Sequence, residues 1–513
     1  MLLRSLLALA LLGCGATAAP PDTPAAPALS FPHGVASGDP LDDRVILWTR
    51  VSGAEGPAPV RWTVYADPAR SEVVERGSAE ARPEHDFTVH VDAAGLAPGT
   101  TYYYAFEAGG VTSPLGRTRT APRGPTERLR VAFFSCANYP AGFFHPYRAV
   151  ARRADVDVVL HLGDYFYEYA SADYGDGAAL GRVPDPEGEV ITLADYRRRF
   201  ASYRRDPDLQ EAHRQHPWVV TWDDHESANN SHEEGAENHD PATEGDWETR
   251  RAASRKAYFE WMPIRPPSGT RLYRRLRFGD LVDLFMLDGR MAGRSPQMDT
   301  DEAGWDGPER QMLGAAQERW LLEGLRASTT SWRLLGQQTV FSPAEGPEGR
   351  NTDQWDGYPA ARQRLLDGLA GDAIAGVAFL TGDIHSSWAF DVPGEGYAAD
   401  GSGALAVELV TPAVSSPPLA NTFRRLEMDV EAIVAFMRET HPHLRWLDLE
   451  HNGYVLLDLT PEALTAEWYF TGERREAAFE ERFARGFRTA PAPVHLVAVE
   501  TPTATPDAPP LAP

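Results

Sequence analysis

The stretch VDVVLHLGDYFYE, residues 156–168, indicates the architecture of the chain. Its first five residues are apolar and β-branched apart from one Asp, which is typical of a short buried strand in an α/β sheet. Asp164 follows this strand at its carboxyl end, where open α/β sheets bind their ligands. Tyr167 comes three residues later, so one helical turn would direct both oxygens at the same hard cation. A Gly-Asp pair after a strand is more often a simple turn, so the motif indicates a metal site only if other strands carry similar groups.

Four further apolar runs end in side chains that bind metals or phosphate. Turn chemistry explains one or two such groups but not five sets at strand ends. Carboxylates gathered at one edge repel one another unless cations lie between them. The pattern therefore predicts two or more metal ions that share a carboxylate such as Asp164, an arrangement suited to phosphoryl transfer. The runs are residues 131–135, followed by Cys136; 218–222, followed by Asp223, Asp224, His225 and Glu226; 284–287, followed by Asp288 and Arg290; and 377–382, followed by Asp383 and His385.

The ligand types divide into two sets. Cys136 and Tyr167 suit ferric iron or zinc, whereas Asp224 and Asp383 suit a harder ion such as calcium or manganese. Cys136 is equally explained as a small buried hydrophobe, so the sequence leaves thiolate ligand and packing residue as alternatives.

His225 and Arg290 are the candidate catalytic residues. His225 lies between two acids in the segment WDDHE, residues 222–226, and a neighbouring carboxylate favours imidazolium and fixes the ring. We therefore interpret His225 as the acid that protonates a leaving alkoxide. Arg290 has two equal interpretations, a fork that binds phosphate oxygens or an ordinary ion pair with Asp288.

Composition limits the class of protein. The chain has 513 residues, of which 42% are apolar, enough for two to four domains. Its formal charge of -25 and isoelectric point near 5.0 argue against a nucleic-acid-binding surface. Solubility explains most of the 74 acidic residues, and cation binding is the alternative for the rest.

The N-terminus predicts export. Residues 1–14 contain one basic residue, an apolar stretch too short to span a bilayer, and then Gly13 and Cys14, as in a secretory signal. Residues 11–14 resemble a bacterial lipobox, in which the Cys carries lipid; cleavage after residues 16–19 is the alternative. We expect a monomeric periplasmic or cell-surface protein anchored by lipid at Cys14.

The rest of the chain divides into segments that differ in composition and in hydrophobic pattern. Residues 15–30 form an Ala- and Pro-rich linker, and residues 495–513 a Pro-rich tail that we expect to be disordered. Between them, residues 31–122 show the short alternating runs of a β-sandwich, with a segment at 96–104 like the tyrosine corner of fibronectin type III domains. Residues 127–484 alternate apolar strands with helical segments, which indicates an α/β domain.

Six segments together resemble one known family. They are HGVASGDP at 33–40, VILWTR at 45–50, Ser135-Cys136, residues 161–168, residues 222–226 with Asn229-Asn230, and TGDIHSS at 381–387. In combination they resemble the alkaline phosphatase D, or PhoD-like, phosphatases of the metallophosphoesterase superfamily, which include some phospholipase D enzymes. The resemblance covers residues 31–470. It implies a layered α/β sandwich (α-β-β-α) preceded by a fibronectin-III-like β-sandwich.

The resemblance also implies a site and an activity. Ferric iron would be held by Cys136, Asp164, Tyr167 and His385, and calcium by Asp164, Asp224, Asp383 and Asn230, with Asn229 as the alternative to Asn230 and zinc or manganese as alternative ions. The expected reaction is hydrolysis of phosphate monoesters, and of diesters, at alkaline pH through a metal-activated hydroxide, with His225 serving the leaving group. The alternatives are a phosphodiesterase or phospholipase D-like enzyme on the same site, and a non-catalytic surface protein stabilised by calcium. Residues 288–294, DGRMAGR, keep Arg290 but displace the family's second cation and lack its aromatic neighbour.

Overall fold

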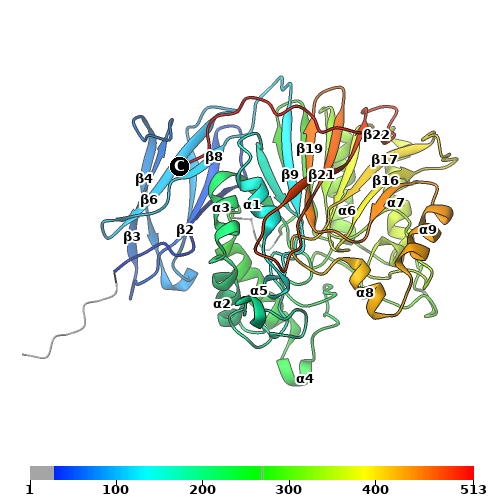
Figure 1. Ribbon diagram of the computed structural model, residues 1–513, viewed down its shortest axis with the longest axis horizontal. Coiled ribbons are helices and arrows are strands. Elements are labelled where there is room, and N and C mark those ends of the chain that lie inside the picture. Colours follow the sequence, from blue (N-terminus) through cyan, green and yellow to red (C-terminus); the bar gives the residue numbers. More distant parts are fainter. Residues whose placement is uncertain (1–27, 267–268, 270) are drawn as a thin grey trace, which may run out of the picture.

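The computed structural model describes residues 28–513 except 267–268 and 270. The predicted signal segment, with Cys14, and the linker up to residue 27 lie outside the described residues. Two large sheets face each other, with helices outside each. A third sheet, from the N-terminal part of the chain, lies at one end of this sandwich, at the left of Figure 1. Within the described part of the chain, no helix is both long and apolar enough to cross a membrane.

The ten-stranded sheet supplies most of the candidate ligands. Its parallel centre, β9-β10-β11, is built from short and fully buried apolar runs, as expected for a sheet covered on both faces. Its strands in spatial order are β22 (Val497–Val499), β21 (Glu481–Thr489), β20 (Leu464–Thr471), β19 (Gly453–Leu459), β9 (Leu129–Phe134), β10 (Val158–His161), β11 (Pro217–Val220), β1 (Val35–Gly38), β2 (Arg44–Arg50) and β5 (Thr88–Ala94).

The other two sheets have seven and five strands. The seven-stranded sheet consists of β12 (Arg274–Phe278), β13 (Val282–Met286), β14 (Trp332–Gly336), β15 (Val377–Thr381), β17 (Ala404–Val410), β16 (Ser387–Pro393) and β18 (Leu444–Asp448). The five-stranded sheet consists of β4 (Val73–Ala81), β3 (Ala58–Tyr65), β6 (Thr101–Ala108) and β7 (Val111–Thr112), with β8 (Gly116–Arg119) also paired to β6.

The described residues form five apolar cores, one of which packs α8 and α9 against β16 and β18. Another fills the space between the two large sheets, with Phe133 and Leu160 on one side and Leu334 and Leu380 on the other. The outer faces are covered by α1, α2, α3 and α5 on the ten-stranded sheet and by α6 and α7 on the seven-stranded sheet. The remaining core joins β1, β2 and β5 to the five-stranded sheet. This α-β-β-α order with a β-sandwich at one end confirms the predicted fold class.

Several helices begin at a residue whose side chain caps the first turn. Thr192 forms a capping box with Asp195 at the start of α2, and Asp206 caps α3. The helices are α1 (His145–Ala151), α2 (Leu193–Tyr203), α3 (Pro207–Gln215), α4 (Pro241–Glu244), α5 (Trp247–Trp261), α6 (Gly314–Ala327), α7 (Pro359–Gly371), α8 (Leu419–Arg425) and α9 (Val430–Thr440), with short 3-10 turns at Pro83–His85, Tyr139–Ala141, Ala178–Leu180 and Trp355–Gly357.

The N-terminal sandwich differs from the sequence-based expectation in one respect. The hydroxyl of Tyr102 accepts a hydrogen bond from the N–H of Ala97 at 2.9 Å, as a tyrosine corner requires. However, β1 pairs in parallel with β11, with Gly38 opposite Trp218, so one sheet of the sandwich continues into the α/β sheet. Residues 31–122 therefore do not form a β-sandwich that is separate from the α/β sheet.

The prediction of a disordered tail over residues 495–513 is wrong. Val497–Val499 adds a strand to β21, and the chain then crosses the molecule to end beside β6 and β8 (Figure 1). The Tyr103 hydroxyl donates to the carbonyl of Pro510 at 2.5 Å, and Gln215 exchanges two hydrogen bonds of 2.9 Å with Ala512. Composition suggested disorder because Pro lacks an N–H donor, but its carbonyl still accepts hydrogen bonds.

Candidate metal centre

The predicted ligands meet at the carboxyl ends of neighbouring strands. Cys136, Asp164 and Asp224 follow β9, β10 and β11, which lie side by side in parallel. Asp383 and His385 follow β15 of the other large sheet. A bridge between Ser135 and Ala413, together with hydrogen bonds from Gln338 to the backbone carbonyls of Trp222 (2.7 Å) and Leu287 (3.0 Å), joins the ends of the two sheets. The two sheets thus deliver their polar strand ends to one place.

Metal-competent atoms form three overlapping groups among the described residues. In each group the candidate ligand atoms lie within 4.8 Å of one another. The groups are Cys136, Asp164 and His385; Asp164, Asp224 and His225; and Asp223, Asp224 and Asp383. Asp164 and Asp224 each belong to two groups, so a shared carboxylate links adjacent groups of candidate ligands.

Tyr167 belongs to the first group. Its hydroxyl lies 3.0 Å from Oδ2 of Asp164 and 3.0 Å from Nε2 of His385, and it accepts a hydrogen bond of 2.7 Å from Ser416. The other ring nitrogen of His385, Nδ1, lies 3.2 Å from the hydroxyl of Tyr174. The phenol oxygen, the imidazole nitrogen and the carboxylate therefore converge as the ligands of one ion would.

The backbone at four of these residues is strained. Cys136, Asp164, Asp383 and His385 have φ angles of 62°, 54°, 65° and 52°. A non-glycine residue in this left-handed region costs of order 1–3 kcal/mol, and such strain persists mainly at functional sites. The strain turns each side chain from its strand end toward the shared centre.

The residues fit bound cations. Asp164 is buried, and its Oδ1 has no hydrogen-bond partner, although its Oδ2 is bonded to Tyr167. Burial raises the pKa of Asp164 well above its ordinary value; His225 opposes this shift, and the charges of Asp223 and Asp224 add to it. A cation beside Oδ1 would satisfy the unpaired oxygen and offset the repulsion among the carboxylates.

His225 is oriented by a different acid from the one expected. Its Nδ1 lies 2.7 Å from Oε2 of Glu168, whereas Glu226 accepts hydrogen bonds from the backbone N–H groups of Asp164, Tyr165 and Asp223. Burial lowers the pKa of His225, but the carboxylates of Asp224 and Glu168 outweigh burial and raise it well above its ordinary value. His225 thus has one nitrogen fixed by Glu168, and its Nε2 remains available.

The structure pairs the guanidinium of Arg290 with acids other than Asp288. Its side chain is fully buried, and its three guanidinium nitrogens bind Asp223 at 2.5 Å, Asp353 at 2.6 Å and Asp383 at 3.0 Å. Asp288 instead accepts the backbone N–H groups of Arg290 at 3.1 Å and Met291 at 2.8 Å. Arg290 therefore neutralises and positions the carboxylates with three of its five N–H donors, and its binding of a phosphate group stays a prediction.

Arg294, the second cation of residues 288–294, contacts an aromatic side chain. The guanidinium of Arg294 lies 5.2 Å from the ring centre of Tyr358, and its Nε donates to the Tyr358 hydroxyl at 3.2 Å. Arg294 also binds Asp353 at 2.6 Å, beside Arg290. The expectation that aromatic support is missing is wrong, because Tyr358 reaches the site from a loop more than sixty residues away.

Asn230 contacts the centre through its backbone, while its side-chain amide nitrogen binds an acid outside the ligand groups. Its backbone N–H donates to Oδ2 of Asp224 at 2.7 Å, and its side-chain Nδ2 donates to Glu237. Its role as a metal ligand stays a prediction.

Several functional residues gave no signal in the sequence. Asp353, Ser416 and Tyr174 lie in loops without periodicity, where polar residues are common. Glu168 stood in the opening motif, and the spacing of four between Asp164 and Glu168 was the one clue to its position.

The layered fold and the linked carboxylate, thiol and imidazole groups define a metal-dependent hydrolase of the metallophosphoesterase type. The PhoD-like phosphatase family matches residues 131–468, and the N-terminal domain of the same family matches residues 16–122. The chain belongs to the PhoD-like phosphatase family and is a metal-dependent phosphoric ester hydrolase.

Comparisons with individual proteins support this family assignment. Alkaline phosphatase D of Bacillus subtilis (strain 168) is 36% identical over 467 residues, which cover 85% of this chain and 77% of the relative. A solved structure of PhoD matches with a TM-score of 0.82 and 33% identity over 94% of each chain. A purple acid phosphatase from yellow lupin (Lupinus luteus) shares the fold at a TM-score of 0.52 and 10% identity, over 89% of this chain and 73% of the other.

Proposed function

We propose that this enzyme hydrolyses phosphate monoesters at alkaline pH and takes diesters as secondary substrates. The observation that carries this proposal is the position of Asp164, which groups with Cys136 and His385 on one side and with Asp224 and His225 on the other. A carboxylate shared between two cation positions suits phosphoryl transfer. The name alkaline phosphatase D of the Bacillus subtilis relative supports the alkaline range.

The two ligand sets favour different ions. Cys136, Tyr167 and His385 supply a thiol, a phenol and an imidazole, which suit ferric iron, with zinc as the alternative. Asp224 and Asp383 supply carboxylate oxygens, which suit calcium, with manganese as the alternative, and Asn230 is the further candidate ligand. Bound ions would supply Lewis acidity and an activated water.

The protein's own residues hold the carboxylates in position and protonate the leaving oxygen. Glu168 fixes Nδ1 of His225, so that Nε2 of His225 donates the proton to the leaving oxygen. Arg290 holds Asp223, Asp353 and Asp383 in place and is a positioning residue in this scheme.

Two measurements test the proposal. Elemental analysis of protein purified without added metal, together with a visible spectrum, identifies the ions; a tyrosinate-to-iron band that disappears in Tyr167→Phe would assign both ion and ligand. Rates with nitrophenyl phosphate and its bis ester rank monoester against diester hydrolysis. Faster hydrolysis of the bis ester would favour the phosphodiesterase alternative, and hydrolysis of neither ester would favour a non-catalytic calcium protein.

We also propose that the protein is exported as a monomer and anchored by lipid at Cys14. Support comes from the sequence of residues 1–14 alone. Cys14→Ala should move the protein from the membrane fraction to the soluble fraction of the producing cell, and an unchanged distribution would contradict the anchor.

A further inference from the structure

An apolar cavity adjoins the metal centre. Its volume is about 370 Å³, within the range of about 300–1,000 Å³ found for small-molecule sites. It lies between α8, α9 and the loop before the Trp355–Gly357 turn, in the region that Figure 1 shows at the lower right. Trp388, Ile433 and Met437 form a buried floor, while Phe423 and Met428 are half-buried at its side.

Several wall residues of this cavity are chain neighbours of the ligand groups. Ile384 lines the cavity and stands between Asp383 and His385 in the chain. The backbone N–H of Leu419, another wall residue, donates to the carbonyl of His385 at 3.3 Å. Gln354 also lines the cavity and follows Asp353, which binds Arg290. Consecutive Cα atoms are about 3.8 Å apart, so the backbone of these wall residues lies directly beside that of the ligand residues.

The cavity carries one unsatisfied polar group. Gln354 is 2% exposed, and its side-chain Nε2 has no hydrogen-bond partner within the described part of the chain. A buried donor without a partner is costly, and a ligand oxygen would satisfy it. The floor and one side of the cavity are apolar, whereas Glu348, Arg350 and Asn351 form a polar part of its rim, and the methionines adapt to ligands of varied shape. The one cation at the cavity, Arg350, is paired with Glu345 at 3.0 Å, so the site has no free charge for a second phosphate group.

We propose that this cavity binds the leaving group of the substrate, and that the preferred substrates are phosphate esters of apolar alcohols or phenols that carry one acceptor oxygen near the ester. This inference rests on the proposed hydrolysis of phosphate esters at the adjoining centre. Phe423, Met428 and Gln354 are the residues that set specificity.

The test is a series of n-alkyl phosphates from methyl to octyl, hydrolysed by the metal-loaded full-length enzyme. Leaving-group basicity hardly changes along this series, so kcat/KM reports binding of the chain. We expect kcat/KM to rise by about fourfold for each methylene until the cavity is full. Inhibition by the matching alkylphosphonates should strengthen in the same order, a measurement that needs no variant.

Variants then locate the effect. Phe423→Ala should lower the octyl-to-methyl ratio of kcat/KM at least tenfold, and Gln354→Leu should weaken inhibition by phosphonates that carry an ether oxygen. Leu426→Ala is the matched control, because Leu426 is 57% exposed on the turn after α8 and does not line the cavity. Hydrolysis with equal kcat/KM along the series and equal phosphonate inhibition would overturn the cavity assignment alone. No hydrolysis of any ester would instead overturn the proposed function.

Discussion

Nδ1 of His225 lies 2.7 Å from Oε2 of Glu168, fifty-seven residues earlier in the chain. Glu168 is fully buried, and its second oxygen accepts the backbone N–H of Asn229 at 2.7 Å. The carboxylate thus ties the turn after β10 to the loop that carries His225. Loss of its charge should leave the imidazole less basic and less well held.

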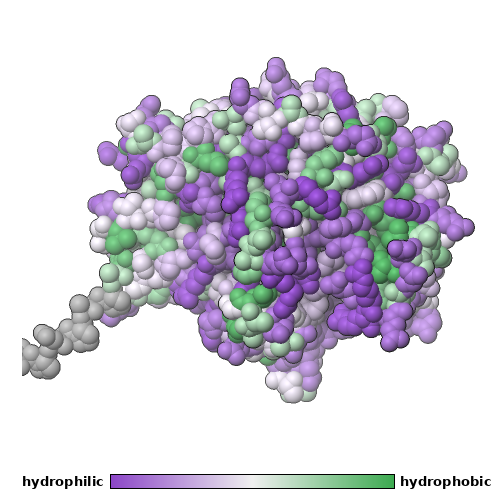
Figure 2. Space-filling view, viewed as in Figure 1, coloured by the Kyte–Doolittle hydropathy of each residue, from purple (hydrophilic) through white to green (hydrophobic). Residues whose placement is uncertain are grey.

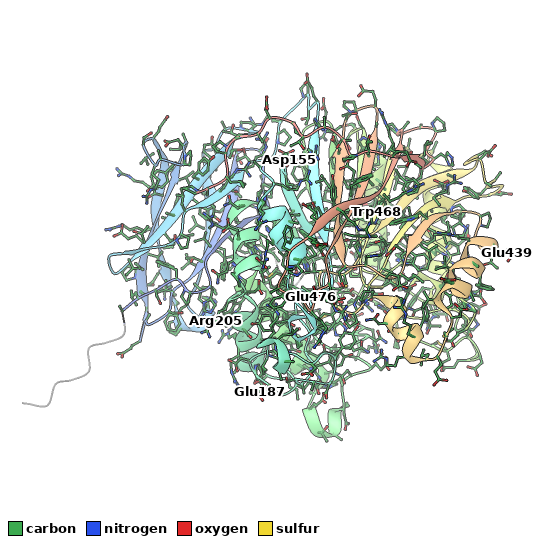
Figure 3. The ribbon with its side chains drawn as sticks, in the orientation of Figure 1. Asp155, Glu187, Arg205, Glu439, Trp468 and Glu476 are labelled. Carbon is green, nitrogen blue, oxygen red and sulfur yellow. The ribbon has the colours of Figure 1, made fainter. Side chains whose placement is uncertain are left out.

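Glu168→Gln should therefore lower kcat about 10- to 100-fold, with a much smaller change in KM, because the amide keeps one hydrogen bond but not the charge. Steady-state kinetics of the metal-loaded enzyme measure this. Glu187→Gln is the matched control, since Glu187 is exposed on the segment before α2 (Figure 3). Equal loss of activity in both variants, or a Glu168→Gln enzyme with unchanged kcat, would remove Glu168 from the mechanism.

Glu226 offers a second prediction, because it supports the centre without facing it. Its carboxylate accepts three buried backbone N–H groups at 2.6–3.0 Å, among them that of Asp164. Glu226→Gln would turn an amide donor toward some of these donors and should cost about 2–3 kcal/mol of unfolding free energy. Urea unfolding measures the loss, and elemental analysis should show less bound metal. A variant with the stability and metal content of the wild type would contradict this role.

Removal of metal gives a third prediction. Asp164, Asp224 and Asp383 are buried or nearly so beside one another, and Arg290 is the one cationic side chain that binds Asp383 among the described residues. Ions present at about 100 times their dissociation constants would stabilise the fold by about 2.7 kcal/mol. Chelation should therefore lower the melting temperature by several degrees, measured by calorimetry. Asp383→Asn, which weakens binding, should show a smaller drop on chelation; equal drops would place the stabilising ion elsewhere.

The sequence predicted the strand ends well and the directions of some side chains poorly. Apolar runs ending at Cys136, Asp164, Asp224 and Asp383 could be recognised because a buried strand must end where polar side chains begin. The direction of Arg290 could not, because it depends on Asp223, Asp353 and Asp383, which come from three separate segments.

The sequence also did not reveal which distant strands pair with each other. Strands β1 and β11 are about 180 residues apart, and nothing in either run of residues specifies a parallel partner. The surface reflects the acidic composition more directly, since Figure 2 shows a mostly hydrophilic face with apolar residues in small separate patches. Composition therefore predicted the surface, while contacts between distant segments required the structure.

Buried histidines give a prediction for acid pH. Burial lowers the pKa of His161 to about 3, and its Nε2 lies 2.8 Å from the hydroxyl of Tyr147. Between pH 6.5 and 3 the unfolded chain binds a proton at this residue and the folded chain does not, so stability falls as pH falls through that window. The loss is about 1.4 kcal/mol per pH unit for each such histidine.

His161→Phe should therefore be less stable than the wild type at pH 7.5, because the bond to Tyr147 is lost, yet should lose less stability on acidification to pH 5. Urea unfolding at both pH values measures the difference, and metal loss on acidification affects both proteins alike. Parallel losses in the two proteins would show that His161 is protonated in the fold.

The tail over residues 501–513 gives the last prediction, because it fastens the N-terminal sandwich to the α/β layers. The carbonyl of Ala504 accepts hydrogen bonds from Arg128 at 3.0 Å and Arg130 at 3.2 Å, and Pro510 accepts from Tyr103 of β6. At about 0.5–1.5 kcal/mol for each bond, deletion of residues 502–513 should cost about 3 kcal/mol. Calorimetry measures the loss, and hydrogen exchange should quicken in β6 and β8 before it does in β9 and β10. Gln215→Ala, which removes the two bonds to Ala512 and one to Glu211, should cost less than the deletion. A truncated protein that melts with the full chain and shows unchanged exchange in β6 would mean that the sandwich is held by its own core and by the β1–β11 pairing alone.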